Sequence, residues 1–68
     1  MKNRLKELRA KHGWSQEELG KLVGVSRQAI NAVERGKFFP TLPLAFKLSD
    51  IFEIPIEEIF IRSKKPTD

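Results

Sequence analysis

Apolar residues recur at three- and four-residue intervals in five stretches of the chain, and this spacing predicts helices. The five predicted helices cover residues 3–12, 15–23, 26–35, 41–52 and 55–60. No convincing alternation of apolar and polar residues, the pattern of a strand, precedes the tail of the chain. The pattern therefore predicts an all-α fold of five helices.

The clearest local signals lie at the ends of the second and third helices. Ser15 and Glu18 form a capping box, in which the Ser15 hydroxyl accepts from the Glu18 amide and the Glu18 carboxylate reaches back. Gly24 ends the second helix, and Ser26 caps the third only two residues later. A turn this short, with apolar residues on both sides, favours two short helices that cross steeply. We expect the second helix to bury Leu19, Leu22 and Val23.

The length of the chain limits it to one small domain. Its 68 residues are too few for a separate sensing module. We expect residues 1–62 to form the domain and residues 63–68 to form a polar tail. Residues 59–62 could instead add a short strand that pairs with residues near Met1, and the sequence does not decide between these alternatives.

The third helix separates its side chains into two faces. At about 100° per residue, Ala29, Ile30 and Val33 share one arc. The opposite arc carries Arg27, Gln28, Asn31 and Arg35. Guanidinium and carboxamide groups match the edges of bases, because arginine pairs with guanine and glutamine or asparagine pairs with adenine. A solvated helix surface would have the same polarity, so this face alone does not establish DNA binding.

Composition narrows the chemistry that the chain can perform. It has no cysteine, which excludes disulfides and thiolate metal sites, and its net charge of +4 gives a modest bias toward polyanionic partners. No apolar run is long enough to cross a bilayer, so we expect a soluble, cytoplasmic protein. His12 stands without clustered carboxylates, so we expect no metal and no cofactor. No serine, lysine or acid has a catalytic context, and we do not expect an enzyme.

Residues 14–37 read WSQEELGKLVGVSRQAINAVERGK, and this stretch resembles the helix-turn-helix of the Cro and repressor family, also called the xenobiotic-response-element family. The resemblance extends from about Leu5 to Phe60 and is closest to the compact subgroup with S-R-Q-x-I-N. It implies a lambda-repressor-like, five-helix DNA-binding domain. It also implies base reading by Arg27, Gln28 and Asn31, and a structural ion pair between Arg9 and Glu34.

We also expect contacts with DNA phosphates on both sides of the third helix. The resemblance places a phosphate-contacting glutamine on Gln16, at the start of the second helix, where backbone N–H groups also favour an anion. Lys37 lies just beyond the third helix and could reach the backbone farther along. The full set of expected phosphate contacts is Gln16, Ser26, Arg35 and Lys37.

Three features depart from the usual family pattern. Gly20 and Ser49 stand where the family usually has alanine, and Gly20 still permits a close approach of the third helix. Phe38 and Phe39 occupy a loop that is usually more polar. None of the three touches the expected reading face, but the role of the two phenylalanines stays open.

The chain carries more apolar residues than one small core needs, at Phe38, Phe39, Phe46 and residues 59–61, and we expect a dimer interface built from the last helix and neighbouring surfaces. The expected interface residues are Phe46, Ile59, Phe60 and Ile61, with packing against the fourth helix inside one subunit as the alternative. Twofold pairing would place two reading helices about 34 Å apart, on an inverted-repeat operator in double-stranded DNA.

The function we expect is a homodimeric transcriptional repressor that binds specific DNA sequences. Two alternatives remain from the sequence. In one, an antitoxin-like regulator also binds a protein partner through its exposed phenylalanines. In the other, a scaffold uses the same fold for protein contacts only.

Overall fold

The structure, a computed structural model, describes residues 2–61. Its five helices are α1 (Leu5–Lys11), α2 (Gln16–Val23), α3 (Arg27–Glu34), α4 (Leu42–Phe52) and α5 (Ile56–Ile59). The predicted fold of five helices is confirmed, and every helix boundary agrees with the expected one to within two residues. The polar tail expected at residues 63–68 lies outside the described residues.

Two short strands join the ends of the described chain. Strand β1 (Lys2–Asn3) pairs antiparallel with β2 (Phe60–Ile61), with Lys2 opposite Ile61 and Asn3 opposite Phe60. Arg4 N–H continues this contact by donating to the Ile59 carbonyl at 2.8 Å. The alternative of a strand paired near Met1 is therefore the one that forms, and it ends the last helix at Ile59.

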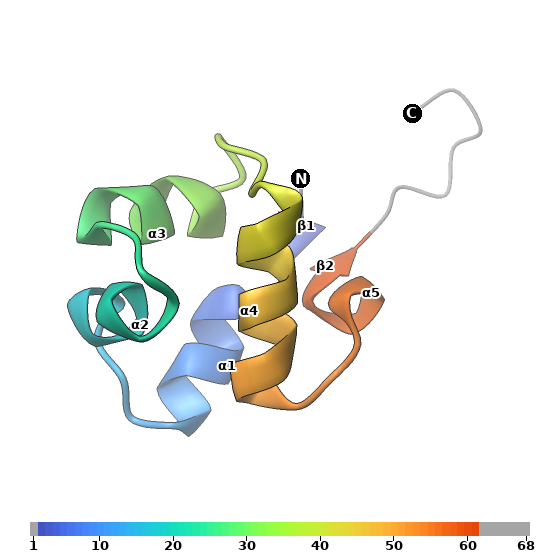
Figure 1. Cartoon of the computed structure of the whole chain (residues 1–68), viewed down its shortest axis with the longest axis horizontal. Coiled ribbons are helices and arrows are strands. Elements are labelled where there is room, and N and C mark those ends of the chain that lie inside the picture. The colour runs from blue at the N-terminus through green and yellow to red at the C-terminus, as the bar shows by residue number, and fades with distance from the viewer. Residues whose placement is uncertain (1, 62–68) are drawn as a thin grey trace.

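Helix α4 runs through the middle of the molecule (Figure 1). Helices α2 and α3 lie together on one side of α4, and α5 lies with the two strands on the other side (Figure 1). This arrangement leaves the outer side of α3 away from the rest of the fold.

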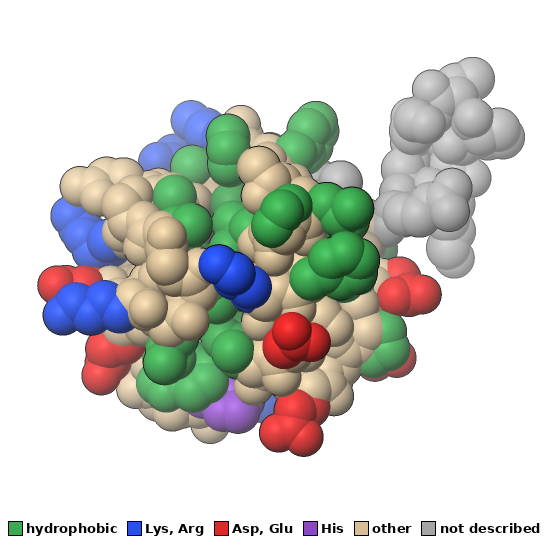
Figure 2. Space-filling model, in the orientation of Figure 1, with side chains coloured by type: hydrophobic (Ala, Val, Ile, Leu, Met, Phe, Trp, Pro, Cys, Tyr) green, Lys and Arg blue, Asp and Glu red, His purple; other side chains and the backbone are tan. Residues whose placement is uncertain are grey.

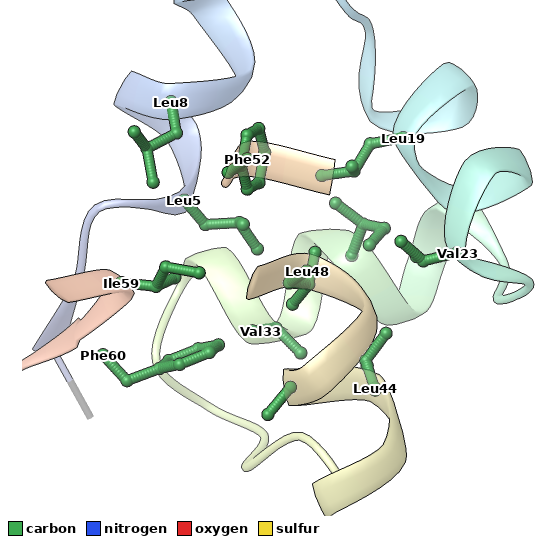
Figure 3. Close-up of a cluster of buried hydrophobic side chains, with 12 residues drawn as sticks. Leu5, Leu8, Leu19, Val23, Val33, Leu44, Leu48, Phe52, Ile59 and Phe60 are labelled. Carbon is green, nitrogen blue, oxygen red and sulfur yellow. The ribbon is translucent and has the colours of Figure 1, made fainter. Parts of the chain in front are cut away.

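The core takes one completely buried side chain from each helix: Leu5, Leu19, Ile30, Leu48 and Ile59, all 0% exposed. Figure 3 shows this cluster together with larger side chains such as Phe52 and Phe60, which close it from two sides. Because the five helices share a single core, the orientation of α3 depends on all of them.

Two expectations about burial need correction. Leu22 is 53% exposed although the helical pattern places it near the core, because α3 and α4 cover only the side of α2 that carries Leu19 and Val23. Leu42 and Phe46, on the outer side of α4, are also exposed. Ile59 and Phe60 are buried in the core of one chain, so this part of the expected dimer interface is not available to a partner.

The turn between α2 and α3 explains one departure from the family pattern. A Cβ atom added at Gly20 would lie 2.5 Å from the backbone oxygen of Val25, so the turn packs directly on the glycine. Gly24 ends α2 with a left-handed φ of 79°, which glycine adopts without strain. Ser49, the second departure, donates from its hydroxyl to the Ile54 carbonyl and so ties the end of α4 to the following loop.

Candidate nucleic-acid interface

Helix α3 is fixed at its start and along its inner side. The Ser26 hydroxyl accepts from the Ala29 N–H at 3.1 Å and caps the helix. Ile30 and Val33 are buried on its inner side. Cap and core together leave the opposite side of α3 facing outward.

The expected base-reading residues lie on that outward side. Arg27 and Gln28, in the first turn of α3, are exposed, and Asn31 one turn later is half-buried. Among residues 2–61, no side-chain hydrogen bond or ion pair engages these three side chains. Their donors and acceptors are therefore available to a ligand that reaches this side.

An ion pair holds the last residue of α3 against α1. Arg9 Nε lies 2.7 Å from Glu34 Oε2, and Arg9 Nη2 donates to Glu34 Oε1 at 3.3 Å. The Glu34 side chain is 5% exposed, and Arg9 also donates to the Trp14 carbonyl at 2.9 Å. The pair that the resemblance implies is thus present and partly buried, and both carboxylate oxygens of Glu34 accept hydrogen bonds from Arg9.

Gln16 joins the same network from the first turn of α2. Its Nε2 donates to Glu34 Oε1 at 3.0 Å, so one carboxylate accepts from both Arg9 and Gln16. The start of α2 and the end of α3 are thereby held in a fixed relation. One of the two N–H bonds on Gln16 Nε2 remains for another acceptor.

The other expected phosphate contacts surround α3. Ser26 lies immediately before the helix, and Arg35 and Lys37 follow it. All three are exposed. The backbone N–H of Lys37 donates to the Ala32 carbonyl at 3.0 Å, which fixes the chain where it leaves the helix.

The start of α2 carries a complete capping box. Ser15 N–H donates to Glu18 Oε1 at 2.8 Å, and Glu18 N–H donates to the Ser15 hydroxyl at 3.0 Å. The backbone hydrogen bond from Ser15 lowers the pKa of the Glu18 carboxyl, and the bond to the Ser15 side chain lowers it further. This confirms the predicted box and orients the turn that carries Gln16.

His12 takes part in packing. Its ring stacks on Trp14 with centroids 4.4 Å apart and meets Phe52 at 5.4 Å. Within the described part of the chain, no group of three or more His, Cys, Asp or Glu side chains could hold a metal ion. Over the same residues, no helix is long and apolar enough to cross a membrane.

Sequence reasoning missed the hydrogen bond between Gln16 and Glu34. The two residues are eighteen positions apart and lie on different helices, so no periodic pattern relates them. The resemblance singled out both residues but gave them separate roles. It implied a phosphate contact for Gln16 and an ion pair with Arg9 for Glu34. The structure adds that Glu34 serves both partners.

The chain is similar to known regulators over nearly its whole length. A family model described as helix-turn-helix matches residues 5–59. An uncharacterized HTH-type transcriptional regulator of Methanocaldococcus jannaschii is 56% identical over 61 residues, which cover 90% of this chain and 92% of that protein. The HTH-type transcriptional regulator YgzD of Bacillus subtilis is 50% identical, covering 88% of this chain and 91% of that one.

Solved structures with the same arrangement include a controller of a restriction-modification system. The controller protein C.AhdI of Aeromonas hydrophila superposes with a TM-score of 0.74 at 40% identity, covering 84% of this chain and 86% of that one. The SOS-response transcriptional repressor LexA of Eubacterium rectale superposes with a TM-score of 0.78 at 32% identity, covering 93% of this chain and 66% of that one.

Proposed function

The chain belongs to the helix-turn-helix family of transcriptional regulators of the Cro and repressor type, and from that membership we propose that it represses transcription as a DNA-bound homodimer. Its relatives are described as regulators of transcription and not as enzymes. The observation that carries the finer proposal is the outer side of α3, where Arg27 and Gln28 are exposed and make no side-chain hydrogen bond or ion pair within residues 2–61. In this proposal α3 lies in the major groove.

Arg27 and Gln28 supply most of the sequence discrimination in this proposal. An arginine in the first turn can donate two hydrogen bonds to guanine O6 and N7, and a glutamine can pair with adenine N6 and N7. Asn31, one turn farther along and half-buried, contacts a base edge nearer the middle of the groove. Each good bidentate pair contributes about 1–3 kcal/mol of discrimination.

Phosphate contacts on both sides of α3 set its position along the duplex. Gln16 uses the N–H that Glu34 leaves available, and Ser26 donates from its hydroxyl while still accepting from Ala29. Arg35 and Lys37 contact the strand beyond the other end of the helix. These four contacts carry affinity without sequence preference.

Two copies of the chain act together in the proposed complex. One eight-residue helix reads only a few base pairs, whereas a twofold pair places two such helices about 34 Å apart on an inverted repeat. Of the interface residues expected from the sequence, Phe46 and Ile61 are exposed and available for pairing. Repression would follow from occupation of a promoter in the cytoplasm, with no cofactor or metal involved.

Selection of binding sites from a pool of random duplexes tests this function. We expect the chain to enrich an inverted repeat, with an association constant that falls linearly with salt concentration on logarithmic axes. An antitoxin-like regulator would give the same enrichment but would also bind a second protein. A chain that enriches no sequence and shows no salt-dependent binding would be a scaffold, and the proposal would be wrong.

A further inference from the structure

Four large apolar side chains are exposed within nine consecutive residues. Phe38 and Phe39 lie in the loop after α3, and Leu42 and Phe46 lie one turn apart on the outer side of α4. Their exposed fractions run from 48% for Phe38 to 67% for Phe39. We call these four residues the apolar surface.

The apolar surface gathers most of the large exposed hydrophobic side chains of the described residues in one part of the chain. Figure 2 shows hydrophobic side chains gathered over the first half of α4 and toward β2, where Ile61 is also exposed. Three phenylalanines at these exposures present on the order of 300–400 Å². The largest apolar patch on a typical soluble monomer has about this size and is often functional.

We propose that the apolar surface binds the same surface of a second copy of this chain. A specific interface of standard size buries about 800 Å² on each partner. The apolar surface supplies close to half of that area, and the polar rim of an interface supplies the remainder. This inference rests on the homodimer of the proposed function and names the surface that forms it.

The charges next to the apolar surface suit pairing with an identical copy. Lys47 follows Phe46 directly, and Asp50 lies one turn beyond Phe46 on the same side of α4. A twofold interface is self-complementary, so a border that carries both signs can pair with itself. DNA fits the surface poorly, because a phosphate backbone offers nothing to four uncharged side chains.

The apolar surface also lies in a position to set the distance between two reading helices. The loop that carries Phe38 and Phe39 begins directly after α3 and is held by the hydrogen bond from Lys37 N–H to the Ala32 carbonyl. Contacts at this loop therefore constrain the end of α3 directly. Ile59 and Phe60 contribute to this geometry from inside the core and not at the interface.

Sedimentation equilibrium on the full chain tests the inference, with Phe46→Glu as the test variant and Leu22→Glu as its matched control. The two side chains are equally exposed, at 54% and 53%, but Leu22 lies on α2, away from the apolar surface. We expect the wild-type chain and Leu22→Glu to dimerise alike. Phe46→Glu should weaken the dimer by at least about 30-fold, as loss of a central interface residue does.

A second variant, Phe39→Glu, should weaken the dimer in the same way, since its side chain lies in a loop and can be changed without loss of core packing. Circular dichroism checks that each variant is folded. A dimer that survives both changes would form through another surface and would overturn the inference, as would a wild-type chain that stays monomeric.

The test of the dimer surface can fail independently of the test of DNA binding. A chain that dimerises through the apolar surface but selects no DNA sequence would leave this inference standing and overturn the proposed function. A chain that selects an inverted repeat and dimerises elsewhere would do the reverse.

Discussion

Helices α3 and α4 are built alike on their inner sides and differently on their outer sides. Each begins with a hydroxyl cap, Ser26 or Thr41, and each buries a run of aliphatic side chains in the shared core. The outer side of α3 offers guanidinium and carboxamide groups, whereas the outer side of α4 offers Leu42 and Phe46. Directional groups suit a partner with a fixed pattern of donors and acceptors, and apolar area suits another protein surface.

The outer side of α3 can read bases as proposed only if the end of α3 at Glu34 is held in place. Replacing Glu34 by alanine should lower the free energy of unfolding by about 3–5 kcal/mol, because the partly buried Arg9 charge loses its partner. Denaturant unfolding measures this loss. Glu7→Ala is the matched control, since the Arg4–Glu7 pair is far more exposed and its loss should change stability little. Equal losses for the two variants would contradict the structural role of Glu34.

The two outer sides should be separable by substitution. Gln28→Ala should weaken binding by about 1–3 kcal/mol at particular base pairs and leave the oligomeric state unchanged. Phe46→Ala should weaken the dimer and leave the preferred half-site sequence unchanged. Binding to a panel of half-site duplexes, together with sedimentation, checks both. If either variant changed both properties, α3 and α4 would not have the separate roles proposed.

The turn before α3 sets how closely α3 can approach α2. Gly20→Ala gains about 1 kcal/mol of helix propensity but forces a Cβ atom against the Val25 carbonyl. Since overpacking costs about 1–3 kcal/mol, we expect a net loss of stability in thermal unfolding. Lys21→Ala, on the exposed side of the same helix, should change little. A more stable Gly20→Ala variant would mean that the turn relaxes easily.

The smallest expected effect concerns pH and the start of α2. Since hydrogen bonds from Ser15 lower the pKa of Glu18, the ionised carboxylate stabilises the folded chain above the ordinary glutamate pKa of about 4.3. That contribution is lost as the pH falls through the lowered value. Glu18→Gln should therefore flatten the fall in melting temperature on acidification. An unchanged pH profile would show that the capping box contributes nothing measurable.

Much of the fold was predictable because its signals are local. The caps at Ser15, Ser26 and Thr41 and the apolar spacing of each helix predict where the elements lie, and all five helices form there. The exposure of Leu22 could not be read in this way. Periodicity gives the apolar side of a helix but not which neighbours cover it.

The candidate site, like the fold, was predictable only where its signals are local. The polar side of α3 followed from residue spacing, and the roles of Arg27 and Gln28 followed from the resemblance. The shared acceptor at Glu34 was not predictable, since it depends on how α1, α2 and α3 meet. The position of Ile59 and Phe60 stayed open from the sequence, because it depends on whether the β1–β2 pair forms, and that pair joins the two ends of the described chain.

The most direct measurement of the central claim compares Arg27→Ala and Lys37→Ala on every single-base variant of the selected operator. We expect Arg27→Ala to lose discrimination at one base pair in each half-site. Lys37→Ala should weaken all duplexes by the same factor and reduce the salt slope by about one. If both variants weakened every duplex equally, the outer side of α3 would contact the backbone alone and would not read the sequence.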